Sequence, residues 1–214
     1  MELIQKIKNI CERPNFFGAN SSEDIYWFIK GYCIAEQKYS TFFNASVLIE
    51  NFELFLSDKY KGEQPISNWG VSFRVLSRNN KESITLFTNI FNEFINKYNY
   101  GELQEEGGND ANRNMFILAL TELLEDDKLE NNVQLQALLL GYELGYIDSK
   151  KIDSDLDEYI ENRIDFFRKI LNELKLPLYL NAHFQLFSRF YPDTRKGVEL
   201  YIKTVLFNLS KNNT

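Results

Sequence analysis

The stretch KESITLFTNIFNEFINKY, residues 81–98, shows the pattern that decides the fold. Apolar side chains recur in it every three or four residues, which places them along one side of an α-helix. This stripe consists of Ile84, Phe87, Phe91, Phe94, Ile95 and Tyr98. The same period recurs along most of the chain, whereas the strict alternation typical of strands is not sustained. The sequence therefore predicts an all-α fold of roughly nine to ten helices, in two packed helical halves, with no substantial sheet.

Capping residues mark where several of these helices begin. Ser22, Ser67 and Thr194 are each placed to cap the helix that follows, because their hydroxyls accept bonds from the first free backbone N–H groups. The expected helices span residues 2–12, 23–38, 46–60, 81–98, 114–127, 131–148, 153–175 and 194–209, with further helical segments around 69–76 and 177–191. Two segments, residues 39–45 and 176–182, have β-favouring neighbours that would alternatively form short strands.

The chain divides at residues 99–112, which hold the only Gly-Gly pair and few apolar side chains. This composition is typical of a linker. The prediction is an N-terminal helical region at residues 1–98 and an acidic C-terminal helical region at residues 113–214.

Both regions contain a Gly-Tyr pair inside a helical run, at Gly31–Tyr32 and at Gly141–Tyr142, and a further pair, Gly145–Tyr146, follows the latter. A small residue where two helices cross closely explains each pair separately. Duplication of the chain is the alternative explanation of the first two pairs, although no repeat of 30 to 50 residues is apparent in the sequence.

Charge is distributed unevenly along the 214 residues. The whole chain has 24 Lys and Arg against 31 Asp and Glu, a net charge of −7, which disfavours a direct nucleic-acid partner. Residues 1–100 hold 11 basic and 11 acidic residues, whereas residues 102–161 hold 4 basic and 16 acidic ones. Like charges at this density repel one another. The acidic segment therefore predicts a surface for a basic protein partner, and the alternative is a surface that only aids solubility.

The predicted partner-binding residues are Glu122 and the acids of the two dense acidic runs of this segment, residues 125–127 and 153–161. They are Glu122, Glu125, Asp126, Asp127, Asp153, Asp155, Asp157, Glu158 and Glu161.

Residues that carry common catalytic chemistry are sparse. His183 is the only histidine, it lies in an apolar segment, and the chain has no GxSxG elbow, so a structural histidine is expected rather than a catalytic base. Cys11 and Cys33 are the only cysteines, which argues against a zinc site or a disulfide scaffold. Residues 153–161 lack the central glycine of a calcium loop, and no phosphate-binding glycine loop is present. We therefore predict a protein that is not an enzyme and has no metal or cofactor.

The N-terminal segment carries charges every few residues and has no apolar run of signal-peptide length. No uncharged apolar stretch approaches the length of a membrane-spanning helix. Two cysteines without CxxC spacing agree with a reducing compartment. A cytoplasmic protein without a membrane partner is expected.

The segment ERPNFFGANSSEDIYWFIKGYCIAEQ, residues 12–37, carries a motif that goes beyond a generic helix. It is similar to a pattern in small bacterial proteins encoded beside polymorphic toxins: Arg-Pro, an aromatic pair, Gly, a Ser-rich loop, then a helix with Phe-x-x-Gly-Tyr-x-x-Ala. The residues that match are Arg13, Pro14, Phe16, Phe17, Gly18, Phe28, Gly31, Tyr32 and Ala35. Residues that look like the later elements of the pattern are Phe52, Phe55, Lys59, Tyr60, Ser67 and Trp69.

This resemblance covers residues 1–98, and it departs from the pattern in having one residue fewer between Pro14 and Gly18. It implies an immunity protein: a cytosolic inhibitor that binds a cognate toxin domain and blocks it. A nuclease toxin would suit an acidic inhibitor, because nucleases hold phosphates in basic clefts. The alternative is a non-catalytic helical adaptor or structural protein that forms a homodimer through exposed aromatic residues.

Overall fold

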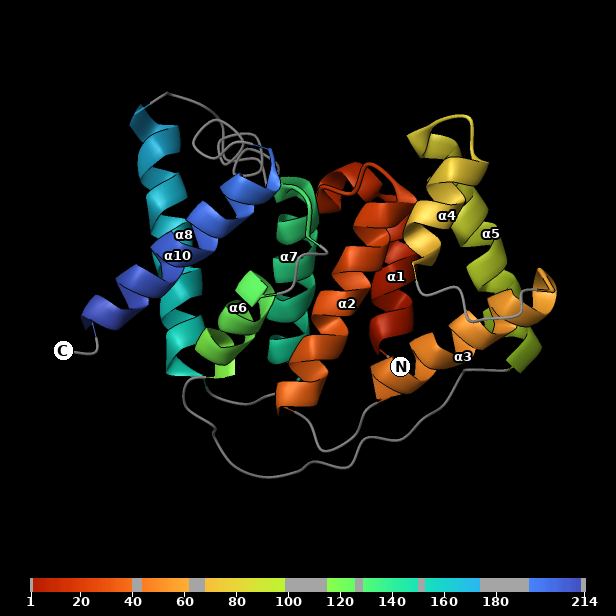
Figure 1. Ribbon diagram of the computed structural model, residues 1–214, viewed down its shortest axis with the longest axis horizontal. Coiled ribbons are helices and arrows are strands. Elements are labelled where there is room, and N and C mark those ends of the chain that lie inside the picture. The colour runs from red at the N-terminus through yellow and green to blue at the C-terminus, as the bar shows by residue number, and fades with distance from the viewer. Residues whose placement is uncertain are drawn as a thin grey trace. The chain divides into compact units, whose positions relative to one another are not determined.

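The computed structural model describes residues 2–39, 44–61, 68–98, 115–125, 129–149, 153–173 and 193–212. These residues form nine α-helices and one 3₁₀ turn, and they contain no strand (Figure 1). The prediction of an all-α fold is confirmed.

The helix bounds follow the sequence periodicity closely. The elements are α1 (Glu2–Glu12), η1 (Pro14–Phe17), α2 (Ser22–Tyr39), α3 (Asn44–Lys59), α4 (Trp69–Leu76), α5 (Asn80–Tyr98), α6 (Met115–Glu125), α7 (Asn132–Ser149), α8 (Ser154–Glu173) and α10 (Arg195–Asn212). Tyr39 ends α2 and Asn44 begins α3, so a strand at 39–45 is excluded for the described part of that segment. The linker at 99–112 and the segment 176–182 lie outside the described residues.

Of the three predicted caps, Thr194 is confirmed, Ser22 has another role, and Ser67 lies outside the described residues. Ser22 is itself the first residue of α2, and its Oγ donates to the carbonyl oxygen of Gly70 at 2.7 Å instead of capping the helix. The side chain of Asn68 caps α4 by accepting from the N–H of Val71 at 3.2 Å, whereas Ser67 lies outside the described residues. Thr194 accepts from the N–H of Gly197 at 3.4 Å, as predicted for the start of α10.

The chain forms two compact units whose boundaries cut across the predicted regions. The first unit contains residues 1–108 and 137–149, and the second contains residues 109–136 and 150–214. Residues 137–149 of α7 thus belong with the N-terminal helices, although the sequence placed them in the C-terminal region. Figure 1 shows α7 running beside α2, and the glycines of both helices make this approach possible.

The closeness of α2 and α7 is set by Gly31 and Gly141. A Cβ atom on Gly31 would lie 1.8 Å from the carbonyl oxygen of Leu138, and one on Gly141 would lie 1.9 Å from that of Phe28. Real Cβ atoms do not approach backbone so closely, and the obstacle cannot rotate away as a side chain would. The prediction that each glycine marks a close helix crossing is confirmed, and the two glycines mark the same crossing.

Aromatic side chains fill the core of the first unit. Trp69 of α4 has no exposed surface and stacks on Phe87 of α5 with ring centroids 4.8 Å apart. Phe52 of α3 packs edge-on against both rings, at 5.6 Å from Trp69 and 6.0 Å from Phe87. The predicted stripe on α5 is buried except for Tyr98, which is 49% exposed at the end of the helix. Offset and edge-to-face pairs add to the stabilisation from burial alone.

The second unit is built on α6, α8 and α10. α10 contacts both α6 and α8. Phe116 of α6 packs on Tyr159 of α8 at 4.9 Å, and the hydroxyls of Tyr159 and Tyr201 share a hydrogen bond of 2.7 Å. Arg195 donates to the carbonyl oxygens of Leu124 and Leu129, so a cation meets the C-terminal end of α6 where the helix dipole favours it.

Candidate functional site

Asp153 is one of the predicted partner-binding acids, but the structure places it inside the second unit. Its side chain has no exposed surface. One carboxylate oxygen accepts from the N–H groups of Asp155 and Leu156 at 3.0 and 3.2 Å, and the other accepts from the N–H of Phe116 at 3.1 Å. Asp153 therefore caps the start of α8 and fastens the start of α6 to it.

Asp155 is also buried, with 2% of its surface exposed in the first turn of α8. A carboxylate at this position interacts favourably with the N-terminal end of the helix dipole. A partner protein cannot reach Asp153 or Asp155 in this fold, so the prediction that these two residues contact a partner is corrected.

Four of the predicted acids are exposed, and we call them the acidic surface. They are Glu122 and Glu125 on α6, and Asp157 and Glu161 on α8. Helices α6 and α8 contact each other within the second unit, and each carries two of these exposed carboxylates. Glu158 is half-buried and accepts from the side-chain amide of Asn162 at 3.3 Å. Asp126 and Asp127 lie outside the described residues.

The motif behind the resemblance is mostly architectural. Pro14 begins η1, and Gly18 ends it in the left-handed conformation with φ of 71°, which glycine adopts without steric cost. The N–H of Ala19 closes this turn by donating to the carbonyl oxygen of Pro14 at 2.9 Å. Phe16 is the exception, since half of its side chain is exposed.

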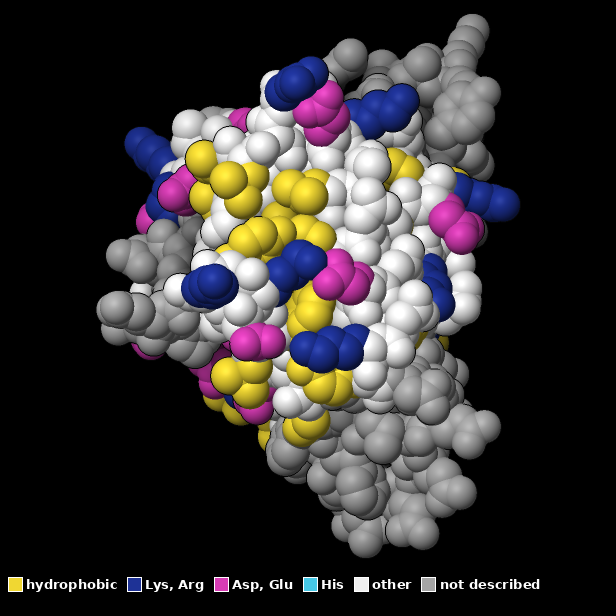
Figure 2. All heavy atoms as spheres, turned by 90° about the vertical axis from the view of Figure 1, so that its right-hand side faces the viewer, with side chains coloured by type: hydrophobic (Ala, Val, Ile, Leu, Met, Phe, Trp, Pro, Cys, Tyr) yellow, Lys and Arg dark blue, Asp and Glu magenta, His cyan; other side chains and the backbone are white. Residues whose placement is uncertain are grey.

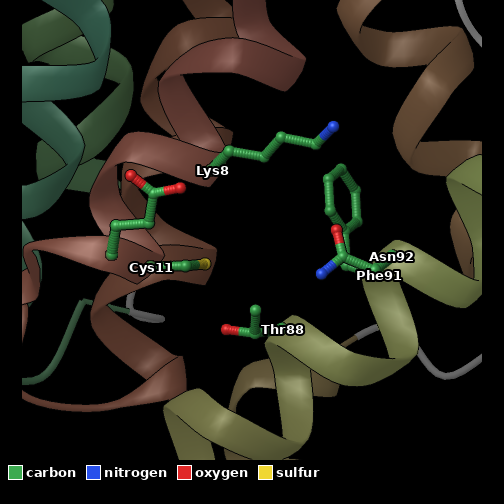
Figure 3. Close-up of a pocket in the computed structure, with 6 residues that line it drawn as sticks. Lys8, Cys11, Thr88, Phe91 and Asn92 are labelled. Carbon is green, nitrogen blue, oxygen red and sulfur yellow. The ribbon is translucent and has the colours of Figure 1, made fainter.

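A groove lies between α1 and α5 in the first unit, with a volume of about 310 Å³. Figure 3 shows Lys8 and Cys11 projecting from α1 toward Thr88, Phe91 and Asn92 of α5. Burial raises the pKa of the Cys11 thiol to about 11, against the smaller opposing effect of a hydrogen bond from Thr88. Burial likewise raises the pKa of Cys33 to about 12. Both cysteines are free thiols and are protonated at neutral pH, which makes them poor nucleophiles.

One face of the molecule displays apolar side chains in a broken band with cationic and anionic groups between them (Figure 2). The large apolar residues most exposed in the first unit are Phe16, Val47, Leu54, Tyr60, Val75, Leu76, Tyr98 and Ile147. Two ion pairs join α3 to α5: Lys59 with Glu93 at 2.7 Å and Lys97 with Asp58 at 3.8 Å. Pairs with this much exposure contribute little to stability.

The described residues contain no group of three or more His, Cys, Asp or Glu side chains that is arranged to hold a metal ion. None of the described helices is long and apolar enough to span a bilayer. His183 lies outside the described residues, so its predicted structural role remains a prediction.

Fold and surface together define an all-helical protein whose exposed acids and exposed apolar residues are candidates for protein contacts. Comparison of the chain with protein-family models, with curated proteins and with solved structures finds no match.

Proposed function

We propose that this protein is a cytoplasmic, non-catalytic immunity protein that binds a cognate toxin domain and occludes its basic active site. The observation that carries the proposal is the acidic surface, in which two contacting helices of the second unit display exposed carboxylates. The resemblance of residues 12–37 to immunity-type proteins supports the same function.

The physical reason is electrostatic complementarity. A toxin that cleaves nucleic acid needs a basic cleft for the phosphates, and carboxylates that enter this cleft occupy the place of the substrate. Opposite charges also steer the two proteins together, which raises the association rate at low salt. A nuclease is therefore the toxin class that fits the acidic surface best, with Asp126, Asp127 and Glu158 as further contacts of the proposed interface.

The experiment is co-expression with the C-terminal domain of the protein encoded by the gene immediately upstream, where the proposal expects the toxin, followed by binding measurements on the purified pair. We expect the protein to protect cells from that domain, and the double variant Glu125→Lys/Glu161→Lys to associate at least tenfold more slowly at low salt. Glu50→Lys is the matched control, because Glu50 is an exposed acid on α3 of the first unit.

Two results would count against different parts of the proposal. An affinity that does not change with salt would exclude the electrostatic interface while leaving the immunity function standing. Failure to protect cells from the neighbouring toxin domain would exclude the immunity function itself.

A helical adaptor that forms a homodimer is the second candidate. The observation that favours it is the exposure of aromatic side chains in the first unit, with Phe16 at 50%, Tyr98 at 49% and Tyr60 at 45%. Light scattering separates the candidates, because the adaptor is expected to have twice the monomer mass and to lose it in the triple variant Phe16→Ser/Tyr60→Ser/Tyr98→Ser. A monomer at all concentrations would exclude this form of the adaptor.

A further inference from the structure

We infer that the chain is an internal duplication, in which α1, α2, α3 and α5 form a first repeat and α6, α7, α8 and α10 form a second. The first observation is a hydrogen bond at the start of α2 that recurs at the start of α7. The N–H of Asn20 donates to the carboxylate of Asp24 at 2.7 Å, and the N–H of Glu130 donates to the side-chain oxygen of Gln134 at 2.7 Å. In both repeats the acceptor lies four residues after the donor.

A second hydrogen bond recurs over a much longer span. The N–H of Ser22 donates to the Oγ of Ser83 at 3.0 Å, and the N–H of Asn132 donates to Oδ1 of Asp193 at 2.9 Å. Donor and acceptor are 61 residues apart in each case. The first N–H groups of a helix have no partner within it and need an acceptor from elsewhere. Both repeats supply that acceptor from the start of their last helix.

The lengths and order of the helices agree with this correspondence. Helices α2 and α7 each have 18 residues, and each carries a Gly-Tyr pair at its tenth and eleventh positions; α7 carries a second pair, Gly145–Tyr146, at its fourteenth and fifteenth positions. Residue 22 corresponds to residue 132, a constant offset of 110, and α3 and α8 begin at residues 44 and 154 with the same offset. The contacts of α5 with α1 and α3 recur as the contacts of α10 with α6 and α8.

The crossing of α2 and α7 within the first unit is locally two-fold symmetric. Leu138 and Phe28, whose carbonyl oxygens face the opposite glycine, each lie three residues before the glycine of their own helix. The tyrosine hydroxyls also reach across: that of Tyr32 donates to Asp148 at 2.5 Å, and that of Tyr142 donates to Tyr39 at 2.9 Å. Each tyrosine thus binds the C-terminal end of the other helix.

Coincidence explains two glycines at a helix crossing, but it does not explain why both long-range hydrogen bonds join residues 61 positions apart. Close crossings recruit small residues in unrelated helices. A spacing of 61 residues, however, is set by the lengths of every helix and loop between donor and acceptor. Duplication explains the spacing, the shared Gly-Tyr positions and the reciprocal hydroxyl bonds together. The side of α2 that carries Gly31 packs against α7, which is the equivalent helix of the second repeat. This is the arrangement that two copies of one helix would adopt in a homodimer.

An experimental structure of the full chain is the first test. Superposition of α2 on α7 is expected to bring α5 onto α10. The N–H of Ser22 is then expected to coincide with that of Asn132, and their acceptors, Ser83 and Asp193, are expected to coincide as well. A structure in which α10 does not coincide with α5 after this superposition would overturn the duplication.

A methyl exchange across the crossing is the second test. A Cβ on Gly145 would lie 2.8 Å from the Cβ of Ala35, the residue at the equivalent position of α2, and 2.9 Å from the carbonyl oxygen of Tyr32, so removing the methyl group of Ala35 relieves the first contact and leaves the second. Gly145→Ala is expected to lower the Tm by about 2–4 °C, and Ala35→Gly/Gly145→Ala to recover at least half of this loss, because equivalent positions accept the methyl on either helix. The control Ala45→Gly/Gly145→Ala changes a buried alanine away from the crossing, on α3, and is expected to show no recovery. A double variant no more stable than Gly145→Ala would overturn the two-fold equivalence.

Discussion

The two units use their polar and apolar residues differently. In the first unit, aromatic rings from α3, α4 and α5 form the interior, and acids and bases balance along residues 1–100. In the second unit, the buried carboxylate of Asp153 binds three backbone N–H groups and joins the starts of two helices, whereas its counterpart in the first unit, Asp24, binds two at the start of one helix. The difference teaches that the number of acids in a segment overstates the charge it presents to a partner. Some of the negative charge stabilises the helices from inside.

The largest loss of stability is expected in the aromatic core of the first unit. Trp69→Ala removes a fully buried ring that stacks on Phe87, so it is expected to cost about 3–5 kcal/mol in the free energy of unfolding. Urea denaturation measures this loss. The control Tyr98→Ala lies on the exposed end of α5 and is expected to cost less than half as much. Equal losses for the two variants would contradict an interior centred on Trp69.

The second expected effect concerns α7, the helix that the sequence assigned to the other region. Gly31→Ala places a methyl group against the carbonyl oxygen of Leu138, and it is expected to cost about 3 kcal/mol because the backbone of α7 must move. Ile147→Ala is the control, because Ile147 is an exposed residue of α7; its free energy of unfolding is expected to change by close to zero. If Gly31→Ala unfolds at the same urea concentration as the wild type, residues 137–149 do not pack on α2 as described.

In the second unit, the capping role of Asp153 gives a smaller expected loss. Asp153→Ala leaves buried N–H groups without their acceptor and is expected to cost about 1–2 kcal/mol, whereas Asp153→Asn keeps one acceptor oxygen and recovers part of this loss. Thermal unfolding of the two variants measures the difference. If the stability of Asp153→Ala is within error of that of the wild type, Asp153 does not cap α8 and is a surface acid instead.

Charge reversal on the acidic surface is expected to change stability least. Glu125 and Glu161 are exposed, so Glu125→Lys/Glu161→Lys is expected to shift the free energy of unfolding by less than about 0.5 kcal/mol per site. The same variant is expected to slow association with the toxin domain. Loss of folding in this variant would show that these carboxylates act inside the second unit, as Asp153 does.

The stability contributed by Asp24, the buried acid at the start of α2, is expected to depend on pH. Burial raises the pKa of Asp24 above its ordinary value of 3.8, against the opposing effect of hydrogen bonds from the N–H groups of Asn20 and Ser21. The folded state therefore holds the proton more tightly than the unfolded state, and the stability linked to that proton is present below pH 3.8 and is lost as pH rises through the folded pKa. Asp24→Asn does not titrate, so its stability relative to wild type is expected to rise between pH 3 and 7. A difference that is constant with pH, measured by urea denaturation, would contradict the raised pKa.

The local signals in the sequence predicted the helices well, because helical periodicity and capping act over a few residues. The stripe on α5, the turn at Gly18 and the cap at Thr194 all depend on neighbours in the chain. The predictions that differed from the structure needed information from distant residues. Ser22 binds Gly70 and Ser83 instead of capping its own helix, and no property of residues near Ser22 indicates those partners.

From the sequence alone follow the helical fold, the excess of acids over bases after residue 100, and the bounds of most helices. Hydrophobic period and helix-breaking residues carry that information locally. Only the tertiary structure decided that Gly31 and Gly141 meet at one crossing, that α7 belongs partly to the first unit, and that Asp153 and Asp155 are buried. Burial and helix crossing depend on contacts between residues far apart in the chain, from 37 positions for Phe116 and Asp153 to 116 for Tyr32 and Asp148, and a local period does not encode such contacts.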